Sequence, residues 1–177
     1  MRPASDSLDK SPGMTFNGVV QHILIYWSIA ALHVLAGAAW FGAMFFSLML
    51  LQPRARRFFG DDEKFEFFIA SISQGARWKV LSALALIAAS GAGLVLLLSR
   101  QRISREWWIL IGVKIVLMVM AMGIFWYASW RLWPRRIFAS ADELPAIRRR
   151  FAAVGISLIL IAGASMALGL LARALRV

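Results

Sequence analysis

Four long apolar runs, separated by polar connections, dominate the chain. They are residues 23–51, 78–99, 107–130 and 151–174. Each run meets the roughly 20-residue length that a membrane-spanning helix needs. None alternates apolar and polar residues as barrel strands do, and backbone groups in lipid must bond internally, so helices are predicted. The pattern predicts an all-α, integral membrane, antiparallel four-helix bundle over residues 21–177, preceded by a polar tail at 1–20.

Composition excludes several classes of protein and of binding site. Hydrophobic residues make up 60% of the chain, which is too many for a soluble globular domain. The chain has no cysteine, so disulfides, thiolate metal sites and iron–sulfur clusters are excluded. The net charge is +11, but lysine and arginine lie mainly in the connections that flank the apolar runs. We therefore expect the lipid bilayer, and no nucleic acid, as the partner of these charges.

The distribution of basic residues also predicts an orientation. Residues 52–79 contain six lysines and arginines and residues 131–150 contain six, whereas the termini and residues 99–107 together contain seven. By the positive-inside rule the two longer connections face the cytoplasm and both termini lie outside. The first apolar run is too long for the core of a signal peptide, so we expect it to remain as a membrane anchor.

Two ionisable side chains interrupt the apolar runs. His33 lies in the first run and Lys114 in the third. Such residues are costly at membrane depth and by default face other helices or a cavity. Each follows a tryptophan of the aromatic belt, Trp27 or Trp108, by six residues, so both lie roughly 9 Å below the belt. Gly93 in the second run falls at about the same depth. All of these positions belong to one predicted level of the bundle.

Two methionines give this level a first interpretation. Met166 lies eight residues before Ala174, roughly 12 Å from the end of the last run. Met118 follows Lys114 by one helical turn. Imidazole and thioether ligands together favour copper. The first hypothesis is therefore a copper ion bound by His33 with Met118 or Met166.

Two other interpretations remain open. In one, His33 is the axial ligand of a haem b, Lys114 pairs with a propionate, and Gly91 and Gly93 make space for the flat ligand. In the other, His33 is hydrogen-bonded within the bundle and Lys114 extends its amine toward the near face of the membrane. The small residues then serve only the close approach of helices. The residues alone leave all three interpretations open.

Several short segments carry a resemblance to a known family. They are Leu32-His33…Trp40-Phe41-Gly42, Ser90-Gly91-Ala92-Gly93, Trp108…Lys114, Arg131…Pro134-Arg135-Arg136 and Arg148-Arg149-Arg150. With them the chain resembles the membrane core of the bacterial copper-resistance protein D family. The resemblance implies a location in the bacterial inner membrane and a function in copper handling or transport near His33. With the orientation predicted from the basic residues, both termini would be periplasmic.

A second family shares part of this frame. His33…Trp40-Phe41, Arg77 and Trp108…Lys114 are similar to the four-helix, haem-binding membrane protoporphyrinogen oxidases of bacteria. There the matching histidine and lysine serve haem or substrate. This resemblance implies a b-type haem- or porphyrin-binding redox protein as the alternative function. A further alternative is an accessory subunit, in contact with other membrane subunits or with copies of itself. No catalytic residue is assigned.

Overall fold

The computed structural model describes residues 16–99 and 104–174. Most of the predicted polar tail therefore lies outside the described residues, although its last residues belong to the first helix. The elements are α1 (Phe16–Phe45), η1 (Phe46–Leu51), α2 (Gln52–Phe59), α3 (Asp62–Ser73), α4 (Ala76–Leu98), α5 (Arg105–Tyr127), η2 (Ala128–Leu132), α6 (Trp133–Ile137) and α7 (Leu144–Ala174). Within the described ranges there is no strand, so the all-α prediction is confirmed.

Four helical stretches are long and apolar enough to cross a membrane. They are Val20–Phe59, Ala76–Leu98, Arg105–Ile137 and Leu144–Ala174. At most 11% of the residues in the most apolar window of each are buried. Large apolar side chains such as Val34, Leu96 and Leu170 are instead exposed on the outer surface. A soluble protein of this size would bury such side chains, so the four predicted apolar helices are confirmed as candidate spans.

The first and third of these stretches continue past the prolines at which helices ordinarily stop. The first apolar run ends at residue 51, just before Pro53, whereas the helix runs on through α2. The π-helical segment η1 directly precedes α2 and its proline, and η2 directly precedes α6 with Pro134. A proline has no N–H group and its ring clashes with the carbonyl four residues earlier. A π-helical turn changes that spacing, so the helix continues.

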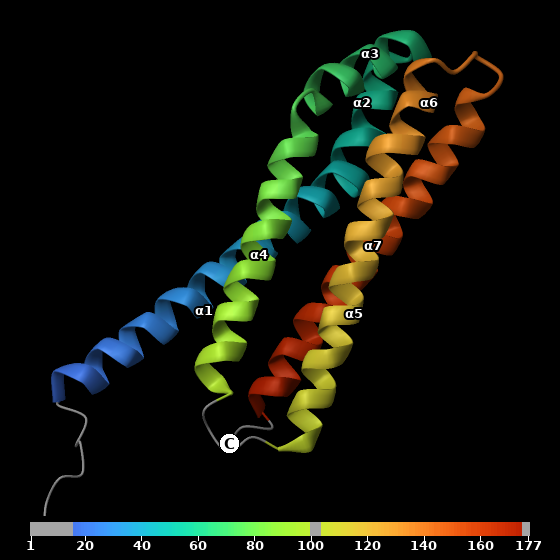
Figure 1. The fold of residues 1–177 in the computed structure, drawn as a ribbon. Coiled ribbons are helices and arrows are strands. Elements are labelled where there is room, and N and C mark those ends of the chain that lie inside the picture. Colours follow the sequence, from blue (N-terminus) through green and yellow to red (C-terminus); the bar gives the residue numbers. More distant parts are fainter. Residues whose placement is uncertain (1–15, 100–103, 175–177) are drawn as a thin grey trace, which may run out of the picture.

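Two tight turns connect α2, α3 and α4. Gly60 and Gly75 have φ angles of +61° and +74°, in the left-handed region that glycine adopts without steric cost. Asp61 then caps α3, because its carboxylate accepts hydrogen bonds from the backbone N–H groups of Glu63 and Lys64. These turns hold α2 and α3 at the same end of the molecule as α6 (Figure 1).

The long helices pack in two pairs. α1 contacts mainly α4, and α5 contacts mainly α7, while α1 also contacts α7 (Figure 1). A buried cluster in the middle of the molecule takes one or two residues from each long helix: Trp40, Leu84, Ala121, Leu158 and Ala162. A smaller cluster of Leu98, Trp107 and Ala172 joins the C-terminal ends of α4 and α7 to the N-terminal end of α5.

Candidate functional site

His33 on α1 points at α4 and is held there by two hydrogen bonds. Its Nδ1 lies 3.0 Å from the carbonyl oxygen of Ile87 and 3.0 Å from the hydroxyl of Ser90. The Ser90 hydroxyl itself donates to the carbonyl of Leu86 at 2.6 Å. Because a carbonyl oxygen only accepts, Nδ1 carries the ring proton, and Nε2 keeps its lone pair. Nε2 has no hydrogen-bond partner among the described residues and is not fully enclosed.

Gly91 permits this placement of the imidazole. A Cβ atom at Gly91 would lie 3.1 Å from Cε1 of His33, closer than almost all real contacts of this kind. At Gly93 a Cβ atom would meet the side chain of Ile29 at 3.7 Å, which is an ordinary van der Waals distance. Of the two predicted small residues, Gly91 is therefore the one whose missing side chain makes room for the histidine ring.

Lys114 on α5 lies against α7. Its Nζ is 3.2 Å from the position that a Cβ atom of Gly169 would occupy. Within the described ranges the amine has no ion-pair partner, and it is close enough for its charge to act on the His33 ring. The described carboxylates all lie near helix ends or in connections: Asp61, Asp62, Glu63, Glu66, Glu106, Asp142 and Glu143. The two ionisable groups of the apolar region thus have no described acidic group to balance them.

Contacts between α1 and α7 place these groups at one level. A Cβ atom at Gly37, one turn after His33, would lie 3.9 Å from Cε of Met166. Met166 in turn precedes Gly169, the neighbour of Lys114, by about one turn. Of the sulfur ligands considered for copper, Met166 therefore lies near this level.

Met118 packs against the buried cluster around Trp40, as does Ile87. In the parts of the chain that the structure describes, no group of three or more histidine, cysteine, aspartate or glutamate side chains could hold a metal ion. A metal at His33 would therefore depend on methionine, on an external ligand, or on a prosthetic group.

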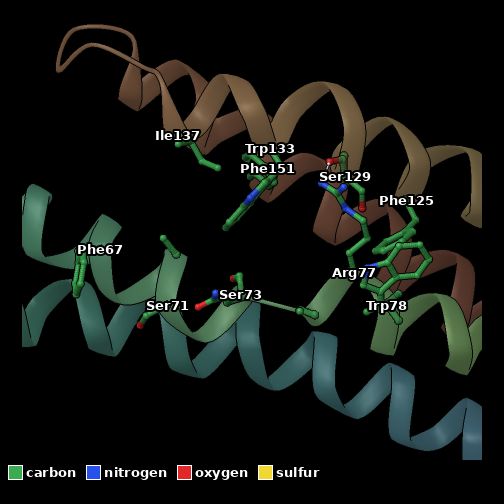
Figure 2. A pocket seen from close by; sticks show the side chains of 16 residues that line it. Phe67, Ser71, Ser73, Arg77, Trp78, Phe125, Ser129, Trp133, Ile137 and Phe151 are labelled. Carbon is green, nitrogen blue, oxygen red and sulfur yellow. Dashed lines mark hydrogen bonds between the residues drawn. The ribbon is translucent and has the colours of Figure 1, made fainter.

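A pocket of about 740 Å³, not predicted from the sequence, opens near the N-terminal end of α4. Figure 2 shows Arg77 of α4 reaching across it toward Ser129, with Trp133 and Phe151 on the far wall. Arg77 donates a 2.6 Å hydrogen bond to the Ser129 carbonyl, and its guanidinium lies 4.5 Å from the ring centre of Trp130. Arg77 thus joins α4 to η2 across the pocket. In the sequence, Arg77 stood out only as one of the residues that resemble the haem-binding oxidases.

Comparison with known proteins adds no assignment: no family model, no curated protein and no solved structure matches the chain.

Proposed function

We propose that the four long helices cross the bacterial inner membrane as an antiparallel bundle with both termini on the periplasmic side. Support comes from the exposed apolar surface of the candidate spans. It also comes from the basic residues of the two longer connections, which the positive-inside rule assigns to the cytoplasm. In this orientation His33 and Lys114 lie in the half of the bilayer nearer the periplasm.

We further propose that the protein binds a carboxylate-bearing tetrapyrrole, of which haem b is the simplest, at the level of His33. The observation that carries this proposal is the hydrogen bonding of the imidazole. Nδ1 donates to the Ile87 carbonyl, which fixes the ring and leaves Nε2 as a free donor for iron. Bound haem would supply a one-electron redox centre, and His33 would be its protein ligand.

Lys114 favours an anionic ligand at this level. An unpaired ammonium group near the histidine is costly in the apolar region unless a negative group joins it. A propionate of the tetrapyrrole has the matching charge, and the amine of Lys114 would hold it by a charge-assisted hydrogen bond. Gly91 and Gly169 keep both side chains in place by leaving room for them. The resemblance of His33, Arg77 and Lys114 to the haem-binding oxidase frame points the same way.

Copper handling is the second candidate function. It has the support of Met166, which lies near the level of His33, and of the resemblance to the copper-resistance D core. The ammonium of Lys114 disfavours it, because a nearby positive charge repels a bound cation.

The test is the visible spectrum and metal content of the purified protein, before and after incubation with haem. We expect a Soret band that His33→Ala abolishes. His22→Ala is the matched control, because His22 is an exposed histidine three turns earlier on α1 and should leave the band intact. Copper without a Soret band would select the second candidate. A Soret band that survives in His33→Ala would overturn the tetrapyrrole site.

A further inference from the structure

A second pocket, of about 510 Å³, lies at the end of the molecule where α2, α3 and α6 gather (Figure 1). We call it the arginine pocket, after the four arginines in its lining. They are Arg56, Arg57, Arg136 and Arg148. They come from α2, α6 and α7, so segments about 80 to 90 residues apart in sequence build one basic site. This pocket is separate from the level of His33, so a ligand bound in it would not depend on tetrapyrrole binding.

The positive charge of the arginine pocket exceeds the negative charge around it. Three of its four arginines share two carboxylates, Glu66 and Asp62, through ion pairs of 2.7 to 3.6 Å. Arg57 has no ion pair among the described residues. Two positive charges are therefore left over at this pocket. Such an excess of one sign attracts an anion.

Arg148 also has an unused donor at this site. Its Nε donates to Glu66 at 2.7 Å and its Nη1 to Asp62 at 2.8 Å. Its Nη2 is buried and has no hydrogen-bond partner among the described residues. A buried donor without a partner destabilises a protein, and nearly all such groups have one. For a bound anion to supply the missing acceptor, the Arg148 side chain would have to turn until Nη2 reaches the pocket.

Apolar side chains complete the lining. Leu48, Phe65 and Ala152 lie beside the arginines, and Leu48 belongs to the first candidate span. The arginine pocket therefore joins the apolar surface of the bundle to its basic end. An acidic group attached to a hydrocarbon chain would find both of its parts matched there.

We propose that the arginine pocket is a phosphate-binding site. Guanidinium groups present planar pairs of N–H donors that match phosphate oxygens, and several arginines around one anion are typical of such sites. The phosphate has two possible sources: the headgroup of an anionic phospholipid, or a soluble phosphate. Basic pockets between spanning helices on the cytoplasmic side commonly hold lipid headgroups, and the apolar wall at Leu48 fits a lipid.

The experiment measures the unfolding temperature of the full-length protein in neutral detergent with phosphatidylcholine. Phosphatidylglycerol and inorganic phosphate are titrated in separately, with sodium chloride keeping the ionic strength constant. The test variant is Arg56→Gln/Arg57→Gln, whose arginines are exposed and leave the Glu66 ion pairs intact. The control variant is Arg54→Gln/Arg135→Gln, which removes two exposed charges from the same end without altering the pocket lining.

We expect phosphatidylglycerol to raise the unfolding temperature, with an apparent affinity roughly tenfold weaker in the test variant and within about threefold of wild type in the control. A shift from inorganic phosphate that requires the same two arginines supports the site and identifies a soluble source. Equal losses in both variants indicate diffuse attraction between basic loops and anionic lipid, and overturn the proposal. The absence of any shift in the wild-type protein also overturns it.

Discussion

The two polar regions of this protein differ in how their charges are balanced. At the basic end, Glu66 accepts hydrogen bonds from both Arg136 and Arg148, with a shortest distance of 2.7 Å to each. At the level of His33, the described residues include no carboxylate near Lys114. Charges at the first region stabilise the fold through partners within the chain. Those at the second add cost to the fold, which is the pattern expected where a ligand completes the site.

Removing the shared carboxylate should therefore have the largest effect on stability. Glu66→Gln leaves the guanidinium of Arg136, whose side chain is only 6% exposed, without its anion. Breaking a buried ion pair by removing one partner costs about 3 kcal/mol or more. We expect a loss near the lower end of this range, because Glu66 is partly exposed. Chemical unfolding in detergent micelles measures it.

Glu63→Gln is the matched control for this change. Glu63 lies on the same helix, α3, is exposed, and its side chain makes no ion pair with a described residue. We expect its unfolding free energy to stay within about 0.5 kcal/mol of the wild-type value. Similar losses in both variants would mean that the arginines at this end do not depend on Glu66, and the contrast between the two regions would fail.

The same ion pairs predict how stability depends on pH. Burial acts to raise the pKa of Glu66, but hydrogen bonds and charge from Arg136 and Arg148 outweigh it, so the pKa lies below its ordinary value of 4.5. A carboxyl with a depressed pKa in the folded state stabilises the fold fully above its unfolded-state pKa. That stabilisation is lost as the pH falls through the lower, folded-state pKa. Unfolding temperatures from pH 7 down to pH 3 should therefore fall less steeply in Glu66→Gln than in the wild type.

The helices and the two polar residues within them, His33 and Lys114, could be predicted from the sequence, because both are local features of the chain. Apolar runs longer than 20 residues leave few alternatives to helices, and His33 and Lys114 are conspicuous within them. The rise-per-residue estimate predicted Met166 at about the depth of His33, and Met166 lies beside Gly37, one turn after His33. Depth does not specify which face of a helix meets which neighbour, so it left open what Met118 contacts; Met118 packs against the cluster around Trp40.

Contacts between segments that are distant in the sequence could not be predicted from local patterns. Glu66 pairs with arginines 70 and 82 residues away, and no periodicity within α3 indicates that pairing. The continuation of the first helix through Pro53 was missed because a proline ordinarily marks a helix end. A π-helical turn is a change of a single hydrogen-bond register, and composition gives no sign of it.

A smaller effect on stability should result from filling the space beside His33. In Gly91→Ala the new Cβ would lie 3.1 Å from the imidazole, so the ring must move. Overpacking costs about 1–3 kcal/mol, and the higher helix propensity of alanine offsets about 1 kcal/mol of it. We expect a net loss of about 1 kcal/mol, together with a clear loss of haem binding by the Soret band.

Gly112→Ala measures the gain in helix propensity without the overpacking cost. Gly112 lies on α5 with open space where its Cβ would be, so alanine there should stabilise the protein by about 0.5–1 kcal/mol. Haem binding should be unchanged in this variant. If Gly91→Ala stabilised the protein to the same extent and bound haem normally, the imidazole would not need its present position.

Lys114→Met should have the smallest effect on the ligand-free protein and the most informative one on the liganded protein. Methionine keeps much of the length and apolar bulk of the lysine stem and removes an unpaired charge from the apolar region. The amine is half-buried and its stem can bend toward the membrane surface, so the cost it now imposes is modest. We expect the variant to be between zero and about 1 kcal/mol more stable than wild type.

The ligand-induced shift then decides what Lys114 does. If its amine pairs with a carboxylate of the bound tetrapyrrole, haem should raise the unfolding temperature less in Lys114→Met than in wild type, because one charge-assisted hydrogen bond is lost. Lys79→Met is the control, since Lys79 is an exposed lysine at the start of α4, far from Gly169. Its shift should equal that of the wild type. An undiminished shift in Lys114→Met would mean that this lysine only extends toward the membrane surface. Ligand binding would then depend on His33 and not on Lys114.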